Sequence, residues 1–387
     1  MHRNVIFRNE NVTESPVSTY DTGRGNFPLL WQQLRDKCID ADTGCDGQNI
    51  GALNDTIVIG AIDGIESPLY SALFNKNISI SIMWKNTLLL IVSVVLIPGL
   101  AVYLEPPLTG QMQTIFMALL KVYIVATLLC FMVSTIAKNY SQVDKLWSVM
   151  PIIYAWIVCV MLDFEPRVLL MAILASIWGI RLTLNFARRG GYSWRFWEGE
   201  EDYRWAEVRK RPGFSHPVAW SVFNFAFISF YQMGLILLFT LPILKSASGT
   251  EISLLDLVLA TVFILLVYLQ AIADTQQWNF QTQKYKLLEQ GKSLPEEYAH
   301  GFVKTGLWSF ARHPNYACEQ AIWITYYLFS VVATGQWLNW SITGCILLVI
   351  LFRNSSDLSE EISALKYSKY QNYQNDIPRF LPLKLPK

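Results

Sequence analysis

The chain has 387 residues, of which 52% are hydrophobic and only 16% are charged, and its formal net charge is +1. A soluble domain usually carries about 25% charged residues, so this composition argues against a soluble globular protein. The net charge points to no class of partner, and the absence of a concentrated basic tract argues against nucleic-acid binding.

Residues 1–81 are polar and acidic, rich in Asn, Asp, Gly and Ser, and show no hydrophobic periodicity. Such a composition cannot bury enough apolar surface to fold alone, so we expect a largely disordered tail or a regulatory extension. The segment lacks the basic start and apolar core of a cleavable signal peptide. Residues 82–387 are predicted to form a multi-pass membrane domain.

Eight apolar blocks follow the tail, and a bilayer crossing takes roughly 20 residues. The third and seventh blocks are short and could be tilted or re-entrant. We therefore expect an all-α, polytopic helical membrane bundle with seven or eight transmembrane helices. The blocks are Ile82–Tyr103, Ile115–Ala137, Leu146–Leu162, Val168–Ala187, Val218–Leu244, Ile252–Ala273, Tyr316–Ala333 and Trp337–Phe352.

Basic residues are concentrated in three segments separated by pairs of predicted helices. Seven lie in 188–216, five in 274–315 and six in 353–387, whereas the opposite connections hold only two. Eight spans place all three segments on one side, and positively charged loops face the cytoplasm. We expect both termini on that side of the membrane.

A polar cluster, Gly306–Glu319, stands at the mouth of the seventh apolar block. Pro314 favours the first turn of a helix, so we expect a helix to begin at His313-Pro314. Its free backbone N–H groups and partial positive charge would form an anion site. Arg312 adds a forked guanidinium suited to phosphate, and His313 adds a second donor. The alternative for Arg312 is a snorkelling interfacial side chain.

Beyond the start of this helix, polar and aromatic residues recur on one face. Tyr316, Glu319, Gln320 and Trp323 have helical spacing and form a polar stripe inside the membrane. A carboxylate such as Glu319 needs a donor there, either a ribose hydroxyl or a basic side chain.

The fourth block carries a second polar face. Arg181, Asn185 and Arg188 are spaced i, i+4 and i+7. Arg181 is about two turns from the helix end and needs a partner or a wet cavity. Snorkelling to the interface is the alternative for this group.

Other polar groups stand at helix ends. Asp274 and Gln276 follow the sixth block, where an acid could accept from ribose hydroxyls or simply mark an ordinary helix exit. Glu361 follows the last block. No grouping of His, Cys and carboxylates has metal-ligand spacing, so no metal site is expected.

The run Thr305-Gly306-Leu307-Trp308 … Ala311-Arg312-His313-Pro314-Asn315-Tyr316 … Glu319 resembles the signature of the steroid 5-alpha-reductase superfamily, and most closely its branch of unknown function. The resemblance covers roughly residues 140–383. Its further parts are Asp144 with Trp147, Arg181–Asn185–Arg188, Asp202-Tyr203-Arg204, Asp274 with Gln276, Glu360-Glu361 and Pro378–Pro382.

The resemblance implies a bundle that takes up NADPH from the cytoplasmic side and reduces an activated carbon–carbon double bond in a steroid, enone or other lipophilic substrate. It implies catalytic roles for Tyr316, as proton donor, and Glu319. The Glu–Tyr pair with which steroid-reducing members polarise a ketone has no counterpart that we can place, which leaves a steroid substrate open. The implied cofactor-binding residues are Arg181, Asn185, Arg188, Asp274, Gln276, Trp308, Arg312, His313, Asn315, Tyr316, Glu319 and Glu361.

Two other functions remain open. Isoprenylcysteine carboxyl methyltransferases share Arg-His-Pro-x-Tyr and bind S-adenosylmethionine, although Asn315 with Glu319 and the Gly306-Leu307-Trp308 lead-in favour the reductase. A lipid-binding or scaffold protein would keep the bundle without turnover. The endoplasmic reticulum is the expected location, with the cofactor site facing the cytoplasm.

Overall fold

The computed structural model describes residues 68–108, 110–211, 213–247 and 251–381. Most of the expected disordered tail, residues 1–67, lies outside these ranges. Helix α3 (Pro68–Tyr103) begins 14 residues before the expected start of the first span at Ile82. The described residues form helices, turns and loops with no strand, which confirms the all-α prediction.

The multi-pass membrane bundle is also confirmed. Six helical segments are long and apolar enough to cross a membrane, and the part of α3 from Thr87 to Tyr103 is a shorter apolar helix. The six are α4 (Gly110–Ala137), α5 (Gln142–Met161), α6 (Pro166–Arg188), the run Pro217–Ser246, α11 (Leu254–Glu289) and α14 (Ile342–Lys366).

The run Pro217–Ser246 is built from four consecutive pieces. These are α8 (Pro217–Phe223), the π-helix η2 (Asn224–Tyr231), α9 (Gln232–Thr240) and α10 (Pro242–Ser246). The predicted seventh span is α13 (Pro314–Thr334). Because it carries several polar residues, it is not one of the six apolar segments, although most of its side chains are buried. Short helices cap the bundle: α7 (Tyr203–Lys210), α12 (Glu296–Ala299), η3 (Gly306–Ser309) and α15 (Tyr370–Asp376).

Two helices extend further toward the C-terminus than the apolar blocks predicted. Helix α11 continues 16 residues beyond Ala273, and α14 begins at Ile342 and continues 14 residues beyond Phe352. Both extensions are polar, and the apolar blocks alone could not reveal them. As a result, Asp274, Gln276, Glu360 and Glu361 lie on rigid helices rather than in loops.

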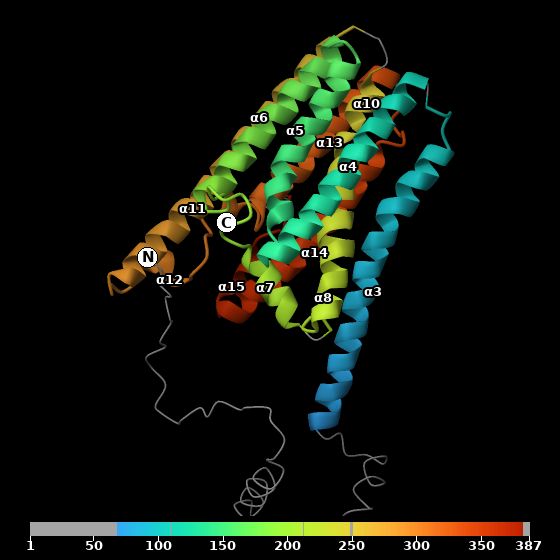
Figure 1. Cartoon of the computed structure of the whole chain (residues 1–387). Coiled ribbons are helices and arrows are strands. Elements are labelled where there is room, and N and C mark those ends of the chain that lie inside the picture. The colour runs from blue at the N-terminus through green and yellow to red at the C-terminus, as the bar shows by residue number, and fades with distance from the viewer. Residues whose placement is uncertain (1–67, 109, 212, 248–250, 382–387) are drawn as a thin grey trace, which may run out of the picture. The chain divides into compact units, whose positions relative to one another are not determined.

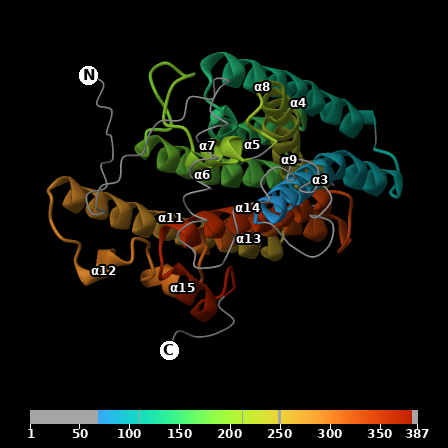
Figure 2. The ribbon, with the colours of Figure 1, turned by 90° about the horizontal axis from the view of Figure 1, so that it is seen from below.

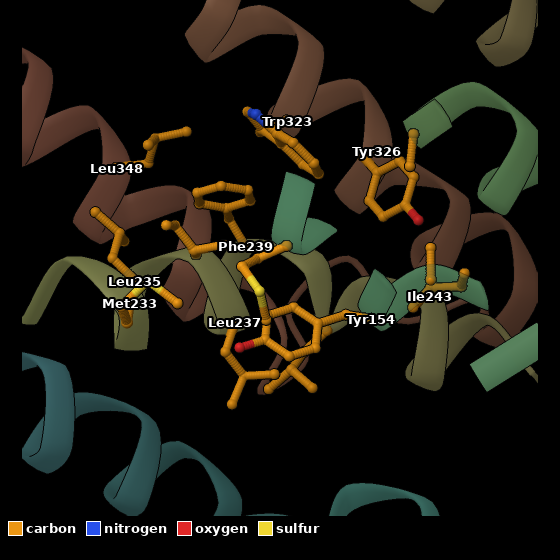
Figure 3. Packing of buried hydrophobic residues seen from close by; sticks show 14 of the residues in the cluster. Tyr154, Met233, Leu235, Leu237, Phe239, Ile243, Trp323, Tyr326 and Leu348 are labelled. Carbon is orange, nitrogen blue, oxygen red and sulfur yellow. The ribbon is translucent and has the colours of Figure 1, made fainter. Parts of the chain in front are cut away.

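The long helices form two layers with α9 between them. Helices α4, α5 and α6 lie side by side, as do α11, α13 and α14, and Figure 2 shows α9 between the two groups. In the core, Tyr154 of α5, Phe239 of α9, Trp323 of α13 and Leu348 of α14 converge (Figure 3). The ring centroids of Phe239 and Trp323 are 4.2 Å apart.

The two ends of the bundle differ in charge. At the end that carries α10, Arg167 pairs with Asp256 at 2.8 Å, both almost completely buried, and Lys245 pairs with Glu105 at 2.6 Å (Figure 1). At the other end lie α7, α8, α12 and α15. The three basic segments meet there, as the helix parity predicts: Arg188 donates to Thr275, and Arg211 pairs with Glu361.

Candidate functional site

A cavity of about 690 Å³ opens among the helices at the basic end of the bundle. One group of its lining side chains is polar and comes from α6, α11 and α13; we call this part the polar chamber, defined by Asn185, Asp274, Asn315 and Glu319. A second group is apolar and comes from α3, α8, η2 and α14. We call this part the apolar arm, defined by Leu90, Phe223, Phe227 and Leu351.

Asp274 joins three helices within the polar chamber. Its carboxylate is 4% exposed and accepts from Arg181 Nη1 of α6 at 2.6 Å, Asn185 Nδ2 at 3.0 Å and Asn315 Nδ2 of α13 at 3.1 Å. A buried carboxylate is tolerated only when it is paired and hydrogen-bonded. This network fixes the spacing of α6, α11 and α13.

Glu319 is held in a similar way, one turn deeper on α13. It accepts from Trp178 Nε1 at 3.0 Å, from Trp323 Nε1 at 3.1 Å and from Gln270 Nε2 at 2.6 Å. All three neighbours donate, so both carboxyl oxygens of Glu319 act as hydrogen-bond acceptors within the protein. The structure therefore presents Glu319 as a fixed hydrogen-bond acceptor.

The start of α13 confirms the predicted helix boundary, with Pro314 as its first residue. The anion site expected there is largely used by the chain itself. The backbone N–H groups of Arg312 and His313 donate to the carbonyls of Pro378 and Arg379 at 2.9 and 3.0 Å. Pro314 has no N–H, so few free donors remain at this helix end.

The Arg312 side chain is likewise used internally. Its Nε and Nη2 donate to the two carboxylate oxygens of Glu360 at 2.8 and 3.2 Å, and Nη1 donates to the carbonyls of Gln374 and Ile377. His313 Nε2 meets the same carboxylate at 3.0 Å. Arg312 and His313 line the cavity, but the expected phosphate-binding fork holds the C-terminal segment instead. Glu360 lies 48 residues away, beyond the reach of local spacing arguments.

Tyr316 presents a free hydroxyl to the cavity. Its ring stacks on His313 with centroids 5.3 Å apart and meets Phe352 edge-on at 4.8 Å. The phenol oxygen makes no hydrogen bond with any described residue, and Arg204 is close enough to interact with it electrostatically. Among the predicted catalytic residues, this side chain has the geometry of a group that acts on a ligand.

A basic wall of the cavity is built from the α6–α7 connection and the start of α7. Asp202 and Arg204 belong to the motifs that carry the family resemblance, but sequence reasoning gave them no role in the site. Arg204 donates through Nε and Nη2 to Asp202 at 2.8 and 2.9 Å. Burial opposes ionisation, but Arg204 more than offsets it and holds the pKa of Asp202 below its ordinary range. Burial would also lower the pKa of Arg204, but the Asp202 carboxylate raises it well above its usual value.

Arg189 lies on the same wall and has a different environment. Its side chain is exposed, lines the cavity and makes no hydrogen bond or ion pair with any residue in the described ranges. The signal that could have found it is its place directly after the polar face of α6. Gln232 was also missed, although the apolar block Val218–Leu244 contains only two amide side chains, Asn224 and Gln232, and amides in such a block are themselves a signal.

Three predicted residues do not line the cavity. Arg181 is held by Asp274, Arg188 faces outward over Trp278, and Gln276 accepts from the N–H of Leu307 at 3.0 Å. The other predicted residues do line it: Asn185, Asp274, Trp308, Arg312, His313, Asn315, Tyr316, Glu319 and Glu361.

Two of these lining residues also brace neighbouring segments. Trp308 of η3 donates to the carbonyl of Ala273 at 3.1 Å, which ties η3 to α11. Glu361 accepts from Arg211 at 2.9 Å. Within the described part of the chain, no group of three or more His, Cys, Asp and Glu could hold a metal ion.

Comparisons with known proteins match the part of the chain that builds the cavity. A family model described as "Protein of unknown function (DUF1295)" matches residues 130–377. An uncharacterized protein of Schizosaccharomyces pombe is 33% identical in an alignment of 273 residues that covers 65% of this chain and 74% of that protein. No solved structure matches.

Proposed function

Since the chain belongs to the DUF1295 family of proteins of unknown function, and since its motifs resemble those of the steroid 5-alpha-reductase superfamily, we propose that it is a membrane-embedded, NADPH-dependent reductase. Its substrate would be a lipophilic molecule, such as a steroid, another enone or a lipid, with an activated carbon–carbon double bond. The proposed location is the endoplasmic reticulum, with the cavity opening toward the cytoplasm.

The observation that carries this proposal is that a polar chamber and an apolar arm belong to one cavity. A dinucleotide needs charged and hydrogen-bonding contacts, whereas a lipid needs apolar walls, and the reaction requires the two molecules to meet. Binding sites with this mixture are mostly apolar and carry a few convergent polar groups. The polar chamber is braced by Asp274 and Glu319, which makes it rigid before any ligand binds.

Two lining residues could bind NADPH, one through its positive charge and the other through a hydrogen-bond acceptor that the protein leaves unused. The unpaired Arg189 could bind phosphate, for which guanidinium groups are well shaped. The buried Oδ1 of Asn185 has no hydrogen-bond partner within the described part of the chain, although buried polar atoms nearly always have one. It could accept from a carboxamide or a ribose hydroxyl. These two residues replace Arg312 as the side chains that we assign to cofactor binding.

In the proposed reaction, NADPH would supply a hydride to the electron-poor carbon of the double bond. The Tyr316 hydroxyl would donate a proton to the neighbouring carbon, since it faces the cavity and is not engaged elsewhere. Arg204, which lines the same cavity, would supply a positive charge while the phenol gives up its proton. Water would later return the proton to Tyr316. The apolar arm would exclude water from the reacting atoms.

The first experiment measures binding of NADPH, NADH and S-adenosylmethionine to the purified full-length protein in detergent by calorimetry. We expect NADPH to bind and S-adenosylmethionine not to bind. Binding of S-adenosylmethionine alone would replace the reductase with a methyltransferase. Binding of neither would favour a lipid-binding or scaffold protein.

The second experiment tests the phosphate assignment with a matched pair of variants. Arg189→Ala removes the unpaired cavity arginine, whereas Arg195→Ala removes an arginine of the same connection whose side chain is 66% exposed and pairs with Glu198. Charged contacts contribute about 1.5–3 kcal/mol, so NADPH affinity should fall about tenfold or more in the first variant only. Equal affinities in the two variants would refute the role of Arg189.

A further inference from the structure

Gln232, the first residue of α9, has an amide that makes no hydrogen bond with the residues that the structure describes. The residue is 5% exposed, lines the cavity and makes no side-chain hydrogen bond with any residue that the structure describes. A primary amide offers two donors and one acceptor, and buried amides are almost always hydrogen-bonded. The amide is therefore available to a ligand in the cavity.

Gln232 lines the same cavity as the apolar side chains of Leu90, Phe227 and Leu351, and Phe227 stacks on Phe223 with ring centroids 5.0 Å apart. Gln232 thus supplies the cavity with a polar group that carries no charge. An amide gives a carboxylate or phosphate no counter-charge for the hydration that it loses, whereas a carbonyl or hydroxyl loses less and gains a hydrogen bond.

The local backbone gives a second reason to regard this position as specialised. Gln232 directly follows η2, an eight-residue π-helix from Asn224 to Tyr231. Such i→i+5 segments are rare and frequently occur at functional sites. Asn224 anchors the segment through Ser134 and Thr135 of α4, at 3.0 and 3.1 Å. The π-helix therefore sets the orientation in which α9 starts, and Gln232 is the residue at that start.

We propose that Gln232 determines the specificity of the cavity by binding the neutral oxygen of a lipophilic ligand. The ligand class is a long apolar molecule with one carbonyl or hydroxyl group, and not a lipid that ends in a charged group. The inference rests on the proposed function in that the ligand of the apolar arm is taken to be the substrate.

The test uses native mass spectrometry of the full-length protein in detergent, without NADPH. The probes are 2-hexadecanone, hexadecane and hexadecanoate, and the measured quantity is the ketone-to-hydrocarbon binding ratio. Comparing this ratio between variants cancels the partition of each probe into the micelle. We expect Gln232→Leu to lower the ratio at least tenfold, because leucine keeps a similar volume and removes the amide.

Gln320→Leu is the matched control. Gln320 is 8% exposed, but its Nε2 already donates to the Tyr316 carbonyl at 3.0 Å, and it does not line the cavity. Its substitution should lower the Tm and leave the ratio unchanged. Gln232→Leu should not lower the Tm, since no protein hydrogen bond is lost, and this result separates loss of binding from loss of folding.

An unchanged ratio in a folded Gln232→Leu protein would overturn the inference, as would wild-type preference for hexadecanoate over the ketone. These outcomes are separate from the calorimetric test of NADPH binding. Ketone selectivity that depends on Gln232 in a protein that binds no NADPH would support the inference and overturn the reductase proposal.

Discussion

Replacing Glu360 with alanine should be strongly destabilising, because one buried carboxylate holds four side chains. Glu360 is 3% exposed and accepts from Arg312, His313, Gln374 and Arg379. Its removal leaves the Arg312 guanidinium, whose side chain is 10% exposed, without its counter-charge. Removing one partner of a buried ion pair typically costs about 3–5 kcal/mol.

Two features place the expected cost near the lower end of that range. Arg312 would keep its contacts with the carbonyls of Gln374 and Ile377, and Arg379 would keep Asp357. A loss of about 3 kcal/mol corresponds to a fall in Tm of roughly 6 °C, at about 2 °C per kcal/mol for a large chain. The assay is thermal unfolding in nanodiscs, followed by intrinsic tryptophan fluorescence.

Glu361→Ala provides the control on the adjacent residue. The Glu361 side chain is 54% exposed and pairs with the partly exposed Arg211, so its loss should cost less than about 1 kcal/mol. Hydrogen exchange should also rise at residues 376–381 in the Glu360 variant alone. If the two variants lower the Tm by the same small amount, the assignment of Glu360 as the anchor of the C-terminal segment is wrong.

Substitutions at three further sites, with their controls, test other parts of the structure. Arg167→Met should lower stability by about 3–5 kcal/mol, and a double-mutant cycle with Asp256→Leu should show a strong coupling energy; additive effects would contradict a direct pair. Gly344→Ala should lower the Tm, at a cost of about 1–3 kcal/mol, because a Cβ there would clash with the backbone of α9. Gly99→Ala, in open space within α3, should be neutral or stabilising, and a loss of stability there would argue against this packing. Tyr316→Phe should leave the Tm unchanged and lower the reduction rate by about 10²–10⁴-fold if the hydroxyl is the proton donor; an unchanged rate excludes that role.

The features that sequence reasoning predicted correctly depend on neighbouring residues or on properties that can be summed along a segment. Proline chemistry placed the start of α13 at Pro314. Helical spacing placed Arg181 and Asn185 on one face of α6, and both meet Asp274. Apolar block length predicted most of the membrane-spanning helices, because the cost of exposing polar groups to hydrocarbon accumulates residue by residue.

The features that sequence reasoning missed depend on long-range partners or on unusual backbone. The Glu360 carboxylate that neutralises Arg312 is supplied by another helix, so spacing could not show that the arginine is occupied. The position of Gln232 follows a π-helix, which an analysis based on 3.6-residue periodicity does not anticipate. The polar extension that carries Asp274 beyond the apolar block was hidden because membrane signals end where hydropathy falls.

The internal pairing of Arg312 changes which arginines can recognise a ligand. A guanidinium that already serves a carboxylate and two carbonyls has little capacity left for phosphate, whatever its distance from the cavity. Arg204 pairs with Asp202 at 2.8 Å, whereas Arg189 acts on Asp202 only from a longer distance and makes no hydrogen bond or ion pair with a described residue. The arginine motif at the start of α13 therefore builds the wall that closes the cavity. Under the proposed function, the anionic cofactor would therefore be bound mainly by the connection that follows α6, where Arg189 lines the cavity.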